Sequence, residues 1–310
     1  MMFSLSWFHT RRCAADTTVL APKPRRPNGL APLMALLWVP LSAALLVACG
    51  GGDPTTRVTN AQASNTRYGQ TMTLSVSGSG LNAEGLQLVT EGAACTGSKR
   101  TSMLEYQGAF TCLIEGTGPL QAVLRNAEGA ELARVEALIA EPRVLMTVTQ
   151  GTRSGSFILE LDPEAAPATV LNFIRYINAG FYTNTIFHRV LAGQLAQGGQ
   201  FIADLSLREA LHDPIVLESQ NGLKNLRGTI AMARTSEPNS ASAQFYLNLR
   251  DNPAFDFVDE SAPGYAVFGR VLSGMDVVDE IGKVAVYTYS NQLPALPQVS
   301  VTITLAAQIQ

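Results

Sequence analysis

The chain has 310 residues, long enough for two domains, and its 46% hydrophobic and 15% charged residues exclude a chain that is disordered as a whole. The formal net charge is -3; residues 1–48 carry five basic residues against one acidic residue (+4), so the remainder carries -3 minus 4, which is -7. A mildly acidic body gives no electrostatic footprint for binding nucleic acid.

The first 48 residues are typical of a targeting segment. A basic stretch, "PKPRRPNG" at 22–29, precedes an uncharged apolar run at 30–48, and "LVAC" at 46–49 resembles a bacterial lipobox. We therefore expect residues 1–48 to be a signal segment and Cys49 to carry the lipid, which predicts an exported protein anchored in the bacterial cell envelope and facing the periplasm. Two alternatives stay open. The apolar run of 19 residues just spans a bilayer and could be an uncleaved transmembrane anchor, or the protein could be cleaved and released.

The next two segments are a linker and a first folded domain. Residues 49–56 are rich in Gly and polar residues and predict a linker. Residues 57–140 show short alternating apolar runs separated by Gly-containing breaks, which predicts a small β-sandwich. The expected strands cover 71–78, 108–116, 120–126 and 133–140. Because no charged cluster, His or acid pair marks a site there, we expect a spacer or interaction module, with ligand or partner recognition as the alternative.

Two of the four cysteines, Cys95 and Cys112, lie in this first domain. An even pair in an exported chain favours a disulfide. The bridge would close a loop of about 18 residues, for which loop-entropy models give roughly 3 kcal/mol of stabilisation. We expect no metal site, because beyond residue 48 the only histidines are His188 and His212.

The pattern changes after residue 142, and residues 143–310 read as a second domain. A strand hairpin is expected first, and then a helix in which Pro167 suits the first helical position and Gly180 suits the C-terminal cap. The expected strands cover 144–151, 155–163, 181–190, 194–202, 228–235, 243–250, 265–272 and 299–308, and the expected helices 166–180 and 274–281. About eight strands and two helices predict a mainly β fold, a closed eight-stranded antiparallel β-barrel with capped ends.

In "TIFHRVLAGQLAQGG" (185–199), an arginine and a glutamine interrupt two apolar runs: Arg189 lies in the first and Gln197 in the second. Burying an unpaired guanidinium costs several kcal/mol, so Arg189 is expected to face water or a partner. A tight bend at 192–193 would bring Leu195 and Gln197 back beside Arg189. That arrangement places a cation, an amide and apolar neighbours on one surface.

Strand parity divides this segment into two faces, with Phe187, Arg189 and Leu191 on one and Ile186, His188 and Val190 on the other. Because His188 points away from Arg189, we expect a buried, hydrogen-bonded core histidine rather than an acid–base group. The sequence shows no nucleophile with an adjacent base, no metal-binding motif and no Gly-rich phosphate loop near this surface. Such a surface suits binding a polypeptide and stabilising a polarised amide without covalent chemistry.

Four collinear stretches of the second domain resemble the cyclophilin peptidyl-prolyl isomerases: "FYTNTIFHRVLAGQLAQGG" (181–199), "NGLKNLRGTIAMART" (221–235), "NSASAQFYLNL" (239–249) and "GYAVFGRVLSGMDVVDEI" (264–281). The resemblance runs from about Val144 to the end of the chain and does not cover 57–140. It implies the eight-stranded barrel with two capping helices and a hydrophobic groove that takes an X-Pro segment.

The resemblance also implies roles for individual residues. Arg189 matches the catalytic arginine, which would stabilise the twisted prolyl amide with no cofactor and no metal. The implied substrate-binding positions are Gln194, Leu195, Gln197, Ala233, Arg234, Gln244, Tyr246, Phe255 and Tyr265. The implied partners are proline-containing unfolded or partly folded polypeptides, so the expected function is to assist the folding of exported proteins.

The chain departs from the family pattern in the proline pocket. Gln194 and Tyr246 each stand where the family has Phe, and a third groove aromatic aligns near Ala254, where Phe255 or Phe257 could fill in. Replacing Phe by Gln at a pocket wall removes about 1–3 kcal/mol of apolar contact. We therefore expect an isomerase of reduced efficiency that binds cyclosporin-like ligands weakly. The alternative, which Gln194 favours, is a cyclophilin-like non-enzymatic peptide-binding module of the cell envelope.

Overall fold

The structure, a computed structural model, describes residues 56–310. The expected signal segment 1–48, the lipobox residue Cys49 and all of the linker except Thr56 lie outside these residues, and their assignment stays a prediction. The domain boundary near 140–143 also stays a prediction. In the described part of the chain, no helix combines the length and the apolar character needed to cross a membrane.

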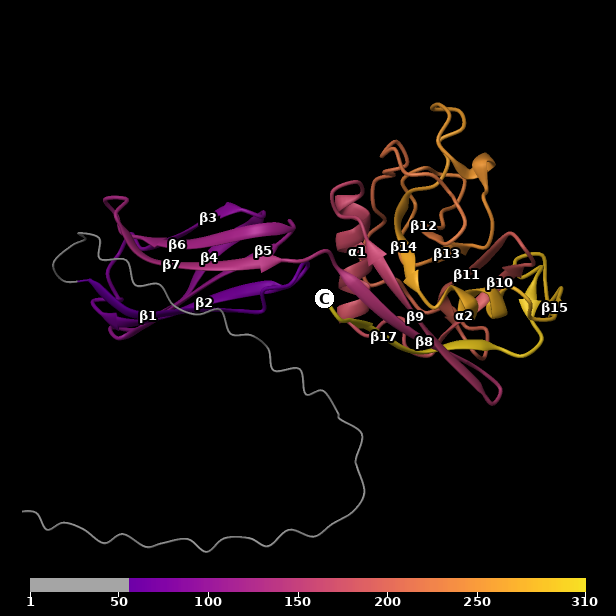
Figure 1. Cartoon of the computed structure of the whole chain (residues 1–310), viewed down its shortest axis with the longest axis horizontal. Coiled ribbons are helices and arrows are strands. Elements are labelled where there is room, and N and C mark those ends of the chain that lie inside the picture. The colour runs from indigo at the N-terminus through magenta and orange to yellow at the C-terminus, as the bar shows by residue number, and fades with distance from the viewer. Residues whose placement is uncertain (1–55) are drawn as a thin grey trace, which may run out of the picture. The chain divides into compact units, whose positions relative to one another are not determined.

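Within residues 56–310, seven strands precede the barrel and form two antiparallel sheets (Figure 1), with orders β1-β2-β5-β4 and β3-β6-β7. Their bounds are β1 (Arg57–Ser64), β2 (Thr71–Ser79), β3 (Gln87–Gly92), β4 (Cys95–Met103), β5 (Gln107–Ile114), β6 (Gly118–Arg125) and β7 (Glu131–Ile139). Alternate side chains of both sheets are buried, among them Leu74 and Phe110 in the first and Leu88 and Leu124 in the second. Two sheets that bury one face each form the expected sandwich.

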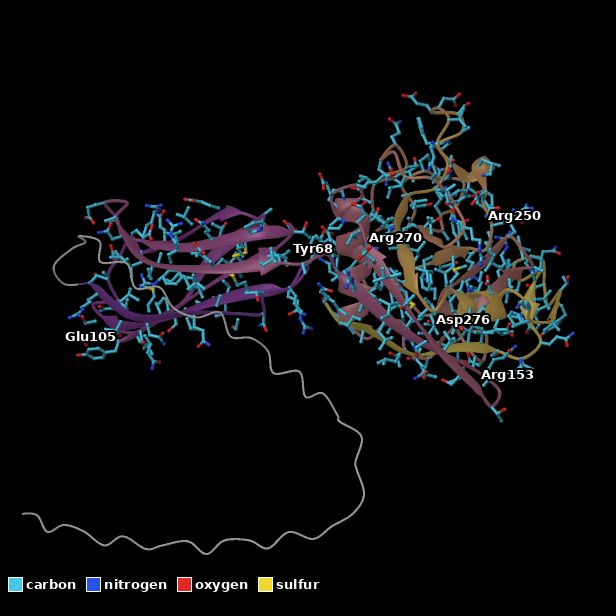
Figure 2. All side chains as sticks on the ribbon, viewed as in Figure 1. Tyr68, Glu105, Arg153, Arg250, Arg270 and Asp276 are labelled. Carbon is cyan, nitrogen blue, oxygen red and sulfur yellow. A yellow bond between two sulfur atoms is a disulfide. The ribbon has the colours of Figure 1, made fainter. Side chains whose placement is uncertain are left out.

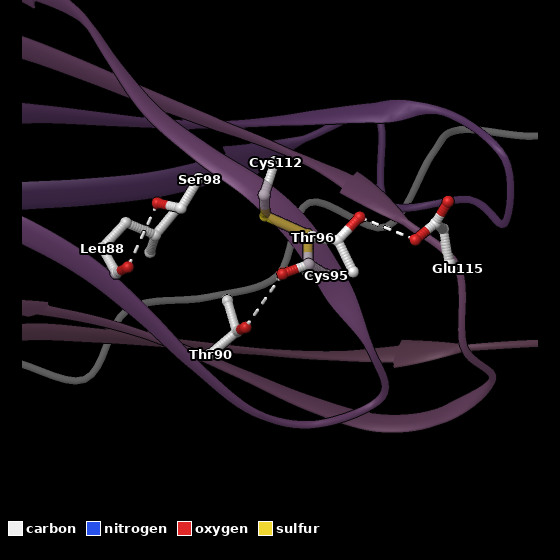
Figure 3. Close-up of a disulfide and its surroundings, with 7 residues drawn as sticks. All are labelled: Leu88, Thr90, Cys95, Thr96, Ser98, Cys112 and Glu115. Carbon is white, nitrogen blue, oxygen red and sulfur yellow. Dashed lines mark hydrogen bonds between the residues drawn. A yellow bond between two sulfur atoms is a disulfide. The ribbon is translucent and has the colours of Figure 1, made fainter.

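The predicted disulfide is present between Cys95 on β4 and Cys112 on β5 (Figure 3), with their Cα atoms 5.5 Å apart. It joins two neighbouring strands of the four-stranded sheet. Thr90 on β3 donates a hydrogen bond from its hydroxyl to the Cys95 carbonyl at 3.3 Å. The bridge therefore fixes β4, whose side chains are mostly exposed, to the half-buried strand β5.

Eight antiparallel strands of the second half of the chain close into a barrel, as the sequence predicts (Figure 1). The order around the barrel is β10-β11-β13-β12-β14-β9-β8-β17, and the pair Ile186–Thr302 closes it. Their bounds are β8 (Arg143–Gln150), β9 (Arg153–Leu161), β10 (Thr185–Leu191), β11 (Leu195–Ile202), β12 (Thr229–Met232), β13 (Phe245–Asn248), β14 (Val267–Ser273) and β17 (Val301–Gln308). The exposed Arg153 begins β9 directly after the two-residue turn, 151–152, of the hairpin of β8 and β9 (Figure 2).

The helical elements are α1 (Pro167–Asn178), α2 (Met275–Ile281) and the short 3-10 helix η1 (Pro253–Phe255), and a small two-stranded sheet joins β15 (Val286–Tyr287) to β16 (Leu296–Pro297). Pro167 opens α1, where its missing N–H costs no helical hydrogen bond, and Gly180 follows the helix with φ of 67°. Phe173 of α1 packs against Phe245 and Phe268 of the barrel. Both expected helices are therefore present.

A β-bulge in β10 puts Phe187 and Arg189 on different faces. The register of β10 against β11 shifts between these two residues. Phe187 and Val190 both pack in the main core, where the Phe187 ring lies 5.9 Å from that of Phe245. Phe187 therefore does not share a face with Arg189, contrary to the prediction from strand parity, because the bulge breaks the alternation of side chains.

Candidate active site

One row of directly opposed residues crosses four strands of the barrel. Arg189 on β10 lies opposite Gln197 on β11. Gln197 lies opposite Tyr246 on β13, which in turn lies opposite Ala231 on β12. Opposed residues of antiparallel strands direct their side chains to the same face. Because Phe245, next to Tyr246, belongs to the barrel core, the row lies on the face away from that core.

Three aromatic rings cluster beside this row. The Tyr246 ring meets those of Phe255 and Tyr265 edge to face, with centroids 5.9 and 5.7 Å away, and Phe255 and Tyr265 are 5.5 Å apart. Leu195 packs with the buried part of this cluster, which is separate from the main core. Phe255 and Tyr265 are only partly buried, so their rings offer apolar surface to a ligand.

Arg189 is partly buried and is held from one side. Its Nη1 donates to Oε1 of Gln197 at 3.1 Å, the one hydrogen bond of its side chain within residues 56–310. In that range Arg143 and Arg227 form ion pairs with carboxylates at 2.9 and 2.8 Å, but Arg189 forms none. Its other N–H groups and its charge are therefore available to a ligand.

Side-chain amides extend the contact of Arg189 along the sheet. Nε2 of Gln197 donates to Oε1 of Gln244 at 2.9 Å, and Nε2 of Gln244 donates to Oε1 of Gln200 at 3.0 Å. Gln200 is buried, and its Nε2 donates to the Arg208 carbonyl at 3.0 Å. The sequence places Gln197 and Gln244 in the groove but misses Gln200, for which the only signal is a second glutamine in an apolar run.

A buried asparagine, Asn225, ties the aromatic cluster to the loop that carries Phe255. The Tyr246 hydroxyl donates to Oδ1 of Asn225 at 2.7 Å, and Nδ2 of Asn225 donates to the Phe255 carbonyl at 3.0 Å. Burial, followed by the nearby Tyr265 and Asp256, raises the pKa of Tyr246 far above its ordinary value, so the hydroxyl stays a donor. The sequence assigns no role to Asn225, because an Asn between Lys224 and Leu226 is typical of an ordinary loop residue.

The bend that joins β10 and β11 is tight, as predicted. Gly193 has φ of 65°, and the Gln194 amide donates to the Leu191 carbonyl at 2.9 Å. The Gln194 carbonyl accepts hydrogen bonds from the Leu249 amide at 2.9 Å and from Nδ2 of Asn252 at 3.0 Å. The backbone of Gln194 is thus fixed beside the row, and its side chain is partly buried.

The remaining predicted groove positions adjoin the same cluster. The Ala233 amide donates to the Gln244 carbonyl at 2.9 Å. The Arg234 guanidinium lies 4.8 Å from the centre of the Tyr265 ring, and its Nε donates to the Gly264 carbonyl at 2.9 Å. Arg234 therefore steadies Tyr265 by a cation–π contact. Of the candidates for the third aromatic, Phe255 joins the cluster, whereas Phe257 lines a separate cavity with Pro238 and Glu260.

His188 is buried, as expected, and its ring lies 4.5 Å from that of Phe201. Its Nδ1 has no hydrogen-bond partner among the described residues, so the expectation of a hydrogen-bonded core histidine is wrong at this atom. Burial, with the charge of Arg189 as a second cause, lowers the pKa of His188 to about 4. The imidazole is therefore neutral at neutral pH.

The arrangement of side chains at this site is typical of a protein that binds polypeptide without a metal ion. Among residues 56–310, no group of three His, Cys, Asp or Glu side chains is placed to hold a metal ion. The site instead presents a cation, held by neutral amides, beside an apolar aromatic wall on a closed barrel. Such a surface suits the binding of a polypeptide and the electrostatic stabilisation of a polarised amide.

Comparison with known proteins identifies the family. The family model described as cyclophilin type peptidyl-prolyl cis-trans isomerase/CLD matches residues 144–304. The chain is 47% identical over 148 residues to peptidyl-prolyl cis-trans isomerase A of Dickeya dadantii, covering 48% of this chain and 75% of that protein. It is 49% identical over 140 residues to peptidyl-prolyl cis-trans isomerase B of Escherichia coli, covering 44% and 85%.

A third relative, a peptidyl-prolyl cis-trans isomerase of Acinetobacter baylyi, is 46% identical over 144 residues, covering 46% of this chain and 74% of that protein. The chain belongs to the cyclophilin-type peptidyl-prolyl cis-trans isomerase family, and its barrel is a peptidyl-prolyl cis-trans isomerase. The family match begins at residue 144, so the N-terminal sheets lie outside it. Of the two functions expected from the sequence, family membership supports the enzyme rather than the non-enzymatic binding module.

Proposed function

We propose that this isomerase lowers the barrier to X-Pro rotation by aiming the Arg189 guanidinium at the prolyl nitrogen of a bound polypeptide. Rotation about a peptide bond has a barrier of about 18–20 kcal/mol, because the planar amide loses its resonance. In the twisted state the prolyl nitrogen becomes pyramidal and accepts a hydrogen bond that the planar nitrogen does not. A donor placed there stabilises the transition state more than the ground state.

The observation that carries this proposal is the position of Arg189 on the same face as an apolar aromatic wall, with the neutral amide of Gln197 between them. Gln197 holds the guanidinium without offsetting its charge. On the same face, Phe255 and Tyr265 provide partly exposed rings on which a prolyl ring can pack. Removing about 7 kcal/mol from the barrier corresponds to about a 10⁵-fold acceleration. A desolvated charge-assisted hydrogen bond and a fixed substrate orientation together account for an effect of this size.

The test replaces Arg189 and measures isomerisation of a proline-containing peptide. We expect Arg189→Ala and Arg189→Lys to lower kcat/KM by about 10²-fold or more, since removing an oriented transition-state donor costs about 3 kcal/mol. Arg153→Ala, at the exposed hairpin turn, is the matched control and should retain full activity. Equal activity of wild type and Arg189→Ala would withdraw the proposed mechanism.

Gln194 supports a second part of the proposal, that turnover is less efficient than an aromatic pocket wall would allow. Its backbone is fixed beside the row by Leu249 and Asn252, and its side chain is partly buried. We expect Gln194→Phe to raise kcat/KM about tenfold and to tighten the binding of cyclosporin-like ligands, because an aromatic ring restores about 1–3 kcal/mol of apolar contact. Peptide isomerisation and ligand titration measure the two effects, and a variant no better than wild type would exclude this role of Gln194.

The cellular part of the proposal places the enzyme in the bacterial cell envelope. There it would face the periplasm through a lipid on Cys49 and act on proline-containing segments of unfolded or partly folded exported proteins. The apolar run at 30–48, the "LVAC" sequence and a disulfide between Cys95 and Cys112 support export to an oxidising compartment. Labelling with a fatty-acid analogue tests it: we expect Cys49→Ala to lose both the label and membrane association. Membrane association without a label supports the transmembrane-anchor alternative instead.

A further inference from the structure

Gln200 lies at the far end of the amide chain that starts at Arg189. The chain runs from Arg189 through Gln197, Gln244 and Gln200 to the Arg208 carbonyl, with donor–acceptor distances of 3.1, 2.9, 3.0 and 3.0 Å. Gln200 is 8% exposed, so it has no bulk water to replace a lost partner. Both polar groups of its amide are therefore used by the hydrogen bonds to Gln244 and Arg208.

The two ends of this chain set its direction. A guanidinium only donates hydrogen bonds and a backbone carbonyl only accepts them, whereas each amide has one accepting oxygen and one donating NH₂ group. Because the Arg208 carbonyl requires a donor, Gln200 turns its NH₂ toward it and leaves its oxygen for Gln244. Gln244 then donates its NH₂ group to Gln200 and leaves its own oxygen for Gln197. Gln197 in turn donates to Gln244 and leaves its oxygen for Arg189. Turning any one amide over would bring two NH₂ groups or two oxygens together.

The accepting end is itself fixed in place. The Arg208 amide donates back to the Gln200 carbonyl at 2.9 Å, so the two residues are linked twice. The Arg208 guanidinium donates to the carbonyls of Phe181 and Thr183 and lies over the Phe181 ring. A fixed acceptor at one end thus defines the orientation of three side chains.

We propose that Gln200 is a positioning residue for isomerisation: through Gln244 and Gln197 it fixes the amide orientation that holds the Arg189 guanidinium toward the prolyl nitrogen. The inference rests on the proposed role of Arg189. Without Gln200, the Gln244 NH₂ group loses its acceptor, and the orientation of Gln244 and Gln197 is fixed from the Arg189 end alone. A turned Gln197 presents its NH₂ group to Arg189 and repels the guanidinium.

The first test is Gln200→Met, which keeps the side-chain length and removes the amide. We expect kcat for a proline-containing peptide to fall about fivefold to tenfold, the effect of losing one oriented hydrogen bond, with KM within about twofold. In the nuclear magnetic resonance spectrum of the full chain, the Arg189 Nε–H signal should shift or broaden. The control Gln220→Met changes an exposed glutamine and should alter neither reading.

The second test is Gln200→Glu, which makes the proposed role depend on pH. A protonated carboxyl can donate to the Arg208 carbonyl and accept from Gln244, as the amide does, but a carboxylate can only accept. We expect kcat of this variant to rise toward the wild-type value as the pH falls through the pKa of the new carboxyl. Wild type and Gln220→Glu, measured alongside over the pH range in which circular dichroism shows each protein folded, should not show this rise.

The outcomes separate this inference from the proposed function. Full activity of Arg189→Ala refutes the arginine mechanism whatever Gln200 does. If Arg189→Ala is inactive but Gln200→Met has the wild-type kcat, only the positioning role is refuted. A loss in Gln200→Met that comes with a lower unfolding temperature and an unchanged Arg189 signal shows a merely structural role and overturns the inference. No recovery of Gln200→Glu on acidification overturns it as well.

Discussion

Arg189 differs from Arg143 and Arg270, two other arginines of the barrel, in what holds it. The guanidinium groups of Arg270 and Arg143 lie 2.8 and 2.9 Å, respectively, from oxygens of Glu160. Their hydrogen bonds, that of Arg270 first, hold the pKa of this carboxyl below its ordinary value. Arg189 is held by the neutral amide of Gln197 instead. A neutral partner orients a guanidinium without offsetting its charge, and orientation with full charge is what an electrostatic catalyst requires.

Buried His188 makes stability depend on pH. Its pKa is lowered from 6.5 to about 4 in the folded protein. Between these two pH values the imidazole is therefore protonated in the unfolded chain but neutral in the folded protein. Stability is therefore complete above pH ~6.5, falls as the pH drops toward ~4 and levels off below that; the whole effect is about 3 kcal/mol. Urea denaturation at a series of pH values measures it.

The variant His188→Leu removes the titrating group and should flatten this pH dependence, even if the variant is less stable at every pH. His212→Gln is the matched control, because His212 is exposed and its loss should leave the wild-type slope in place. A slope that is the same in wild type and His188→Leu would show that other groups cause the acid loss of stability.

Some site residues can be recognised from the sequence, but the hydrogen-bond partners of a site residue cannot. Arg189 and Gln197 stand out because polar side chains interrupt apolar runs, and the resemblance to cyclophilins supplies Gln244 and Tyr246. Gln200 and Asn225 are also side-chain amides that form hydrogen bonds in the site, but the sequence does not predict this role. Whether a buried amide meets a carbonyl or a hydroxyl depends on strands and loops far apart in the chain, as for Asn225 and Tyr246, which are 21 positions apart.

Asn225 and Asn252 tie the loop that holds η1 to the barrel through their side chains. Asn225 accepts from the Tyr246 hydroxyl and donates to the Phe255 carbonyl, so it connects a strand of the barrel to the segment that supplies the outer ring of the pocket. We expect Asn225→Ala to lower the free energy of unfolding by about 2–3 kcal/mol, because it leaves buried polar groups unpaired. KM for a proline-containing peptide should rise several-fold as Phe255 loses its support.

Tyr246→Phe is the matched comparison for this prediction. It removes only the hydroxyl, and Oδ1 of Asn225 keeps the hydrogen bond from Nδ2 of Asn248 at 3.2 Å. Its expected cost is about 1 kcal/mol, with KM nearly unchanged. Denaturation and steady-state kinetics measure both variants, and an Asn225→Ala enzyme with a wild-type KM contradicts the proposed support of Phe255.

Strand prediction succeeded where burial alternates and failed where it does not. Met72, Leu74 and Val76 are all buried on β2, and their spacing of two residues predicts the strand. The strands β1, β3 and β4 of the N-terminal sheets are not predicted, because each lies at a sheet edge and has few buried residues. The bulge in β10 is also hidden, since a register shift depends on the partner strand and not on the strand's own sequence.

For the molecule as a whole, the disulfide and the catalytic site belong to different parts of the chain. Cys95 and Cys112 lie in the N-terminal sheets, whereas the predicted site residues all fall between 189 and 265. Removing the bridge in Cys95→Ala/Cys112→Ala should destabilise the N-terminal sheets by about 3 kcal/mol. Peptide isomerisation should keep the wild-type kcat/KM, and a clear loss of activity would show that the N-terminal sheets contribute to catalysis.

Closure of the barrel also decides how a client polypeptide is held. The pair Ile186–Thr302 joins the last two strands, so the catalytic sheet presents no free edge with unpaired backbone groups. An open edge invites an extended chain to add itself as another strand, which is a route to aggregation. We therefore expect a client polypeptide to bind without being added as a further strand, and to dissociate after each turnover without breaking a ladder of backbone hydrogen bonds.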